Sequence, residues 1–260
     1  MLQHLEIGSA CLSDFLSFLS TWYLKDFMFV SVQAHIYAVC KDAAGIAGNI
    51  FAFGLFLSPI PTFKRIIRNQ STEQFSGLPY IYALLSCLIT MWYGTPFMSY
   101  DNAMVMTVNS MGALFQLAYI IVFITYAEKD SKFRMLGLLL AVFGLFAAIV
   151  AGSLQMVNGG IRQIVVGLLS CCALISMFAS PLFVINLVIR TKSVEFMPFY
   201  LSLSTFLMST SFFLYGVLND DTFVYVPNGI GTMLGIVQLV LYFYYKSRED
   251  SKEPLLVSYT

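Results

Sequence analysis

Residues Met135–Ile161 read MLGLLLAVFGLFAAIVAGSLQMVNGGI, a run of 27 residues without a charged side chain. About 20 apolar residues are enough for a helix to cross the roughly 30 Å hydrocarbon core of a bilayer. Arg134 and Arg162 flank the run directly. The stretch therefore predicts a transmembrane helix.

The composition of the whole chain agrees with this interpretation. Of its 260 residues, 58% are hydrophobic and only 11% are charged, whereas soluble domains are about 45–50% apolar and about 25% charged. A chain so poor in charge cannot cover a surface that faces water, so most of its exterior must face a lipid bilayer. Its 14 basic and 14 acidic residues balance, and this neutrality predicts no nucleic-acid partner.

From Ala43 onward the sequence contains seven uncharged windows of membrane-spanning length. None alternates with period two, so helices fit better than the strands of a barrel. The predicted fold class is an all-α membrane protein with seven transmembrane helices. Residues 1–42 form an N-terminal extension, either an interfacial helix or an unstructured segment, and residues 246–260 a disordered tail. The windows are Ala43–Phe63, Gln74–Tyr100, Asn102–Ala127, Met135–Ile161, Gln163–Ile189, Phe196–Asn219 and Thr222–Tyr245.

Lysine and arginine alternate between the two sides of these windows. The links after the first, third and fifth windows, together with the C-terminal tail, hold eleven basic residues, whereas the remaining links hold only Arg162. Basic residues accumulate on the cytosolic side of membrane proteins. We therefore expect a cytosolic C-terminus and a non-cytosolic N-terminus.

The chain also repeats itself. Ser58-Pro59 recurs as Ser180-Pro181, and Tyr93-Gly94 recurs as Tyr215-Gly216, both at an offset of 122 residues. Three helices reverse the side of the membrane, so a fourth span between two copies makes them parallel. We expect a first three-helix repeat at 43–127, a linker helix within 128–163 and a second repeat at 164–245. Parallel repeats of this kind build transporters that hold their substrate near the midplane.

Six stretches of the sequence carry a family resemblance. They are Leu57-Ser58-Pro59, Thr62-Phe63-Lys64-Arg65, the stretch from Ser71 to Tyr80, Ala179-Ser180-Pro181, the stretch from Lys192 to Phe199, and Val226-Pro227-Asn228-Gly229. Together these motifs resemble the SWEET family of sugar transporters, over residues 43–245. The resemblance implies two parallel three-helix bundles joined by a linker helix (3+1+3), which move mono- or disaccharides down their gradient without a cofactor. The resemblance also implies that a homo-oligomer can form. Phe199–Gly216 is most similar to a plant subgroup placed at the vacuolar membrane, with the plasma membrane as the alternative.

Asn109 and Asn228 are the leading substrate-binding candidates. They lie at matched positions of the two repeats, inside predicted spans, where an amide without a partner costs about 1–3 kcal/mol. An uncharged carboxamide suits the hydroxyl groups of a neutral sugar, and an interhelical hydrogen bond is the alternative. The expected cargo is a glucose-like monosaccharide, with sucrose as the alternative. By family position, the pocket lining should include Cys87, Met91, Met177, Met208 and Phe212, for each of which helix packing is the other interpretation.

Two further sets of residues are candidate gates. Pro59, Pro79, Pro181 and Pro198 lie near the predicted cytosolic ends of four helices, where proline can act as a hinge or simply end a helix. The set resembles the proline tetrad at the cytosolic gate of the family. On the opposite side, a tyrosine of one repeat could bond an aspartate of the other, although acids in solvated loops are an equal alternative. These outer-gate candidates are Tyr93, Asp101, Tyr215, Asp220 and Asp221.

What the windows lack also narrows the function. None contains Asp, Glu, Lys, Arg or His, the residues that mark proton relays inside membranes, which favours a passive facilitator. No phosphate-binding loop, metal-ligand cluster or nucleophile–base pair is present, so we expect neither an enzyme nor a metal or cofactor. A seven-helix receptor, which would lack the internal repeat, and a facilitator for another small neutral solute are the alternatives.

Overall fold

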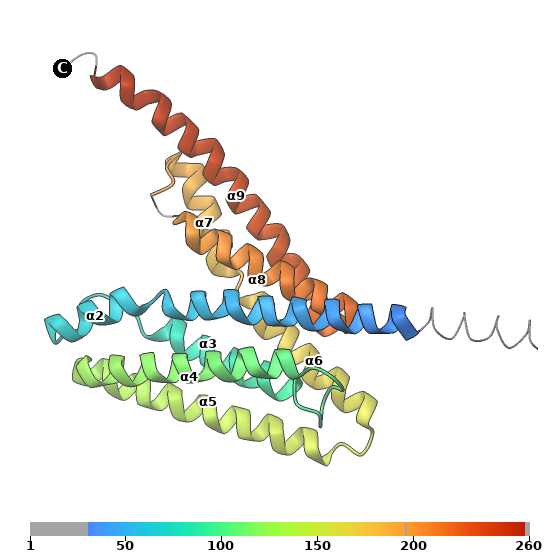
Figure 1. Ribbon diagram of the computed structural model, residues 1–260. Coiled ribbons are helices and arrows are strands. Elements are labelled where there is room, and N and C mark those ends of the chain that lie inside the picture. Colours follow the sequence, from blue (N-terminus) through green and yellow to red (C-terminus); the bar gives the residue numbers. More distant parts are fainter. Residues whose placement is uncertain (1–30, 196, 258–260) are drawn as a thin grey trace, which may run out of the picture.

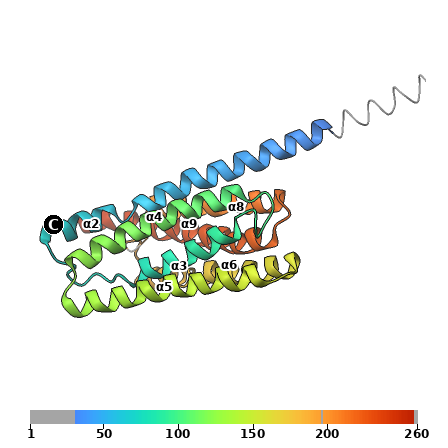
Figure 2. The same ribbon diagram turned by 90° about the horizontal axis from the view of Figure 1, so that it is seen from below.

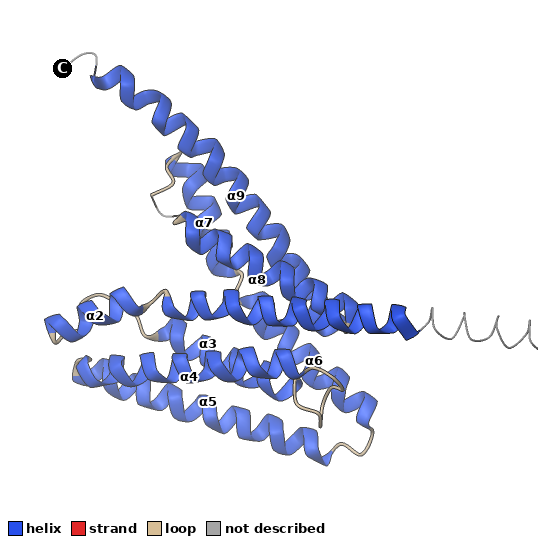
Figure 3. Ribbon diagram, in the orientation of Figure 1, coloured by secondary structure: helices blue, strands red, loops and turns tan. Residues whose placement is uncertain are grey.

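The computed structural model describes residues 31–195 and 197–257, and over these residues the chain consists of helices joined by short links, with no strand (Figures 1 and 3). The first helix occupies residues 31–57 of the described part. The helices that follow are α2 (Ile60–Asn69), α3 (Leu78–Tyr93), α4 (Ala103–Tyr126), α5 (Lys129–Gln155), α6 (Gly159–Ser176), α7 (Ala179–Thr191), α8 (Phe199–Leu218) and α9 (Thr222–Val257).

These helices make seven crossings, as the uncharged windows predict. Within the described residues, six helical stretches are long and apolar enough to span a membrane, and the 16-residue α3 is a shorter apolar helix. The first crossing, Ser31–Asn69, and the fifth, Gly159–Thr191, each consist of two helices in succession. The predicted seven-helix class is confirmed.

Both ends of the helical region extend further than the sequence predicts. The first helix already includes residues 31–42, which we assigned to the extension, because no glycine or proline interrupts the chain there. Residues 1–30 lie outside the described part. At the other end, the prediction of disorder from residue 246 onward is wrong up to Val257, where α9 ends. The lysine, arginine and glutamate residues after Tyr245 are good helix formers, so the helix continues beyond the apolar segment.

Proline explains why the first and fifth crossings are broken. Proline has no N–H to donate to the carbonyl four residues earlier, which ends or kinks a helix. In the first crossing the break falls at Ser58-Pro59, and α2 begins directly after it. In the fifth crossing α6 ends at Ser176 and α7 starts at Ala179, just ahead of Pro181.

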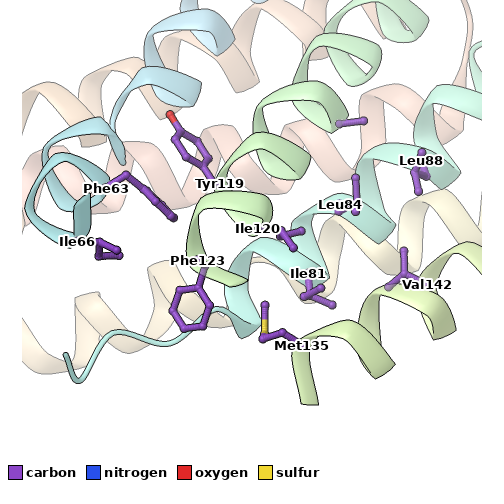
Figure 4. Packing of buried hydrophobic residues seen from close by; sticks show 11 residues of the cluster. Phe63, Ile66, Ile81, Leu84, Leu88, Tyr119, Ile120, Phe123, Met135 and Val142 are labelled. Carbon is purple, nitrogen blue, oxygen red and sulfur yellow. The ribbon is translucent and has the colours of Figure 1, made fainter. Parts of the chain in front are cut away.

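The N-terminal bundle, residues 31–155, packs around α3. Helix α3 contacts α4 and α5, and Figure 4 shows the apolar cluster that these helices share with α2. Met135 and Val142 of α5 belong to this cluster. The helix between the repeats is therefore fixed to the N-terminal bundle rather than free between the two.

The C-terminal bundle, residues 159–257, is formed by α6, α7, α8 and α9. Helix α6 connects the two bundles, because it contacts α3 on one side and α9 on the other. Toward the C-terminal end of α9, the helices α7, α8 and α9 diverge from α2 and α4 (Figure 1). In the turned view of Figure 2, the first helix extends past the opposite end of the bundle. We call the end where α9 terminates, at which the two bundles diverge, the open end, and the opposite end, at which they lie together, the closed end.

Candidate functional site

A cavity of about 160 Å³ lies between the two bundles. Both bundles contribute to its wall, and no charged side chain lines it. Of the residues predicted to bind substrate, all but Met91 lie in this wall. The lining residues are Phe56, Ser86, Cys87, Thr90, Tyr93, Val105, Val108, Asn109, Ser170, Leu174, Met177, Met208, Phe212, Phe223, Val224 and Asn228.

Asn109 on α4 and Asn228 on α9 face the cavity in equivalent ways. The Asn109 Nδ2 donates a hydrogen bond of 2.9 Å to the carbonyl of Val105, and the Asn228 Nδ2 donates one of 2.8 Å to that of Val224. Each bond runs to the carbonyl four residues earlier and uses only one amide hydrogen. In the described part of the chain, neither amide bonds another helix, so each Oδ1 and second N–H stays available to a cavity occupant.

The wall also contains hydroxyl groups that we did not predict from the sequence. Ser86 and Thr90 on α3 and Ser170 on α6 are buried and line the cavity. Serine and threonine are common in transmembrane helices, where the hydroxyl usually bonds the carbonyl of the preceding turn, as Ser110 does with Met106 at 2.7 Å. Only the three-dimensional structure shows which hydroxyls face the cavity.

Met91 is placed differently from our expectation. It packs against the apolar cluster of the N-terminal bundle and does not line the cavity. A helix turns about 100° per residue, so Met91 lies about 140° around the helix from Ser86, whereas Thr90 lies only about 40° from it. The α3 stripe of Ser86, Thr90 and Tyr93 faces the cavity, and Met91 lies away from it.

At the closed end, Tyr93 and Asp221 connect the two bundles. The Tyr93 Oη donates to both carboxylate oxygens of Asp221, at 2.8 and 2.7 Å, and both side chains are buried. Asp221 also accepts from Asn102 Nδ2 and from the backbone N–H of Phe223, at 2.9 Å for the latter. Asp221 is therefore a buried, fully bonded carboxylate and not a solvated loop acid.

The matching tyrosine, Tyr215, makes a second link but to a different acceptor. Its hydroxyl donates to the backbone carbonyl of Asp101 at 2.8 Å, and the Asp101 carboxylate instead pairs with Lys41 on the first helix. Asp220 is exposed. Two tyrosines thus bond across the bundles at the closed end, one to a carboxylate and one to a carbonyl.

The four prolines fall into two structural pairs. Pro59 and Pro181 stand at the breaks of the first and fifth crossings, whereas Pro79 is in the first turn of α3 and Pro198 is the N-cap of α8. Proline fits a helix start without strain, which is also what simple helix termination would give. The hinge role of all four stays a prediction.

Comparison with known proteins identifies the family. A family profile described as "Sugar efflux transporter for intercellular exchange" matches residues 42–131 and 164–250. The two matched segments correspond to the two repeats and leave out most of α5. The chain belongs to the SWEET family of sugar transporters.

The similarity to individual SWEET proteins covers most of the chain. Bidirectional sugar transporter SWEET2 of Arabidopsis thaliana is 71% identical over 225 residues, covering 85% of this chain and 95% of the relative. SWEET2a of Oryza sativa subsp. japonica is 62% identical over 232 residues, covering 88% and 95%. A solved eukaryotic SWEET transporter, at 3.7 Å resolution, matches with 55% identity and a TM-score of 0.80, covering 82% of this chain and 99% of that one. Together these confirm the 3+1+3 fold of a multi-pass membrane protein that is not an enzyme, and they exclude the receptor alternative.

Proposed function

We propose that this SWEET protein is a passive uniporter for a monosaccharide, which binds between the two bundles. The observation that carries the proposal is the uncharged cavity that Asn109 and Asn228 face from equivalent positions of the two repeats. Amide and hydroxyl groups fit the hydroxyls of a sugar, and the apolar wall fits its C–H faces. Because no acidic side chain, lysine, arginine or histidine lines the cavity, transport needs no proton transfer, and its direction follows the sugar gradient.

The size of the cavity favours a single sugar ring. An engineered cavity of about 150 Å³ in another protein holds one benzene molecule, and the cavity here has about 160 Å³. Glucose has twice as many non-hydrogen atoms as benzene, so one sugar ring would fill such a volume and bring its hydroxyls against the wall, whereas a disaccharide needs wider bundle separation. We therefore favour a glucose-like cargo over sucrose in this conformation.

The closed and open ends support transport by alternating access. We assign the open end to the cytosol, because the basic links and the C-terminus of α9 lie there, so that this conformation faces inward. Tyr93 with Asp221 and Tyr215 with Asp101 form the outer gate in its closed state. Pro59, Pro79, Pro181 and Pro198 form the hinge region of the cytosolic gate.

We place the protein in the vacuolar membrane, on the similarity of Phe199–Gly216 to the vacuolar subgroup of plant SWEET proteins. A fluorescent fusion viewed in plant cells tests the location, and labelling of the plasma membrane instead of the vacuole would contradict it.

During transport, the repeats at 43–127 and 164–245 move relative to each other. The linker helix within 128–163 moves with the first repeat.

Counterflow in proteoliposomes tests the transport activity. Vesicles loaded with unlabelled glucose should accumulate labelled glucose transiently, and accumulation of labelled sucrose under the same conditions should be much weaker. A proton ionophore should leave the signal unchanged. Loss of uptake with the ionophore would overturn the passive mechanism, and counterflow of a different neutral solute without glucose would overturn the choice of cargo.

Substitution of the two asparagines tests the site. Asn109→Ala and Asn228→Ala should each reduce glucose counterflow at least about fivefold, because an unpaired sugar hydroxyl in the cavity costs about 1–3 kcal/mol. The matched control is Asn69→Ala, which replaces the exposed last residue of α2 and should transport normally. Normal uptake by either cavity variant would remove that asparagine from the site.

A further inference from the structure

The repeat places one cross-bundle contact at two equivalent positions with opposite chemistry. The offset of 122 residues pairs Gly48 with Ser170 and Thr90 with Phe212. A Cβ atom on Gly48 would lie 2.7 Å from the ring of Phe212, so the ring packs directly on the helix backbone. At the equivalent position, the Ser170 Oγ donates a hydrogen bond of 3.0 Å to the Thr90 Oγ1. One contact is apolar, and its counterpart is a hydrogen bond between two hydroxyls.

The Ser170–Thr90 bond leaves a donor directed at the cavity. Both residues are buried, at 1% and 3% exposure, and both line the cavity. Within the described residues, Thr90 makes no other side-chain hydrogen bond, so its own hydroxyl proton is uncommitted. Ser86, one turn earlier on α3, is 2% exposed, lines the same wall and has no protein partner among the described residues. A hydroxyl in this wall that has no acceptor in the protein can donate a hydrogen bond to a molecule in the cavity.

The opposite wall has no such groups. The residues of α8 at the positions equivalent to Ser86 and Thr90 are Met208 and Phe212, and both line the cavity. The cavity therefore has a hydroxyl-bearing side on α3 and α6 and an apolar side on α8. A sugar ring has the same two aspects, a hydroxyl edge and a C–H face.

We propose that Ser170 is a positioning residue for sugar specificity. It holds the Thr90 oxygen as an acceptor, so that the Thr90 proton points to one hydroxyl of the sugar, while Phe212 contacts the opposite C–H face. A hydrogen bond accepted by a hydroxyl also strengthens that hydroxyl as a donor. The bound sugar thus takes one orientation, although the two repeats are related by symmetry. This proposal rests on the proposed function, since it concerns the orientation of the cargo.

The test compares glucose with its 2-, 3-, 4- and 6-deoxy analogues as competitors of labelled glucose uptake in proteoliposomes. We expect one analogue to compete about three- to tenfold less well than glucose in the unmodified protein, which is the usual range for one neutral hydrogen bond. In Ser170→Ala this discrimination should fall to less than about twofold for that analogue alone. Thr90→Val should remove the same discrimination, and Ser170→Thr should restore it.

The matched control is Ser153→Ala. Ser153 is also buried and accepts a bond of 3.0 Å, from Trp92 Nε1, but it does not line the cavity. In the Ser153→Ala protein, the deoxy analogues should compete with labelled glucose as they do in the unmodified protein. Equal weakening of all sugars in Ser170→Ala, or an unchanged pattern in both cavity variants, would overturn the positioning role. Absence of glucose uptake by the unmodified protein would instead overturn the proposed function itself.

Discussion

Tyr93→Phe is the sharpest test of the outer gate, because it removes a single oxygen atom. Tyr93 is fully buried, and its hydroxyl donates to both oxygens of the Asp221 carboxylate at 2.8 and 2.7 Å. The phenyl ring of the variant can occupy the same space, so packing at the closed end should persist. What is lost is one of the hydrogen bonds that join the N-terminal bundle to the C-terminal bundle.

The size of the effect follows from the acceptor. Hydrogen bonds to charged groups contribute about 1.5–3 kcal/mol, and Asp221 keeps its bonds from Asn102 and the Phe223 N–H, so the lower figure applies. About 1.5 kcal/mol shifts the equilibrium between closed and open outer gate about tenfold. Tyr215→Phe removes a bond to the neutral carbonyl of Asp101, for which about 1 kcal/mol and about a fivefold shift are expected. Tyr93→Phe should therefore exceed Tyr215→Phe.

Distances between two spin labels, measured without sugar, report the equilibrium between the closed and the open outer gate. Labels on Tyr100→Cys and Thr222→Cys, both exposed at the closed end, report the separation of the bundles in a protein from which the native cysteines are removed. If about 5% of molecules have an open outer gate, as is usual for a minor state, a tenfold shift raises this population to about one third. An unchanged distance distribution in Tyr93→Phe, or a larger change in Tyr215→Phe, would refute the gate assignment.

Three other predictions concern packing, cargo size and pH. Gly94→Ala should destabilise the protein by about 1–3 kcal/mol, because the added Cβ would lie 2.6 Å from the backbone nitrogen of Met106. In thermal melts in detergent, the control Gly144→Ala should behave like the unmodified protein, because its added Cβ would have no atom within 4 Å. Phe212→Ala should enlarge the cavity and raise sucrose competition relative to glucose in the uptake assay, with a loss of stability of about 3 kcal/mol; unchanged preference would remove Phe212 from the wall. The hydrogen bond from Arg65 lowers the pKa of Glu73, so its stabilising contribution is complete above the ordinary glutamate pKa and is lost as the pH falls through the lowered value. Because the contribution of this pair is constant between about pH 5 and pH 8, it should cause no pH-dependent change of the melting temperature in that range, and a transition there would contradict the pairing.

The crossings and the repeat could be predicted because they depend on properties that every residue carries. A membrane span needs about 20 predominantly apolar residues, so the seven uncharged windows predicted the seven crossings. The ends of helices do not depend on the bilayer in this way. Residues 246–253 are polar or charged, yet α9 continues through them, since a helix needs only suitable propensity once it has been started by the apolar segment.

The sequence predicts those site residues whose type is rare in membrane spans, such as asparagine. It does not predict those whose type is common there, such as serine and threonine. Asn109 and Asn228 are conspicuous because a buried amide is costly, whereas Ser86, Thr90 and Ser170 resemble many hydroxyls that bond their own helix. Met91 shows the second limit, since a family position identifies a helix turn but not its rotation. A displacement of about 100° between neighbouring residues decides whether a side chain faces the cavity or the core.

The two repeats share their close glycine contacts and the asparagine pair of the cavity, and they differ in other cavity side chains, such as Thr90 and Phe212. Gly94 lies against the backbone nitrogen of Met106, and Gly216 against that of Tyr225, both with 2.6 Å between the nitrogen and an added Cβ. Because the two backbones are similar, each bundle can take the position that the other has, and the protein can face either side of the membrane. A sugar, however, has no two-fold symmetry, so a symmetric wall would leave some of its hydroxyls unpaired. Different side chains on two similar backbones let the protein bind an asymmetric sugar and still alternate between opening at its cytosolic end and opening at its outer end.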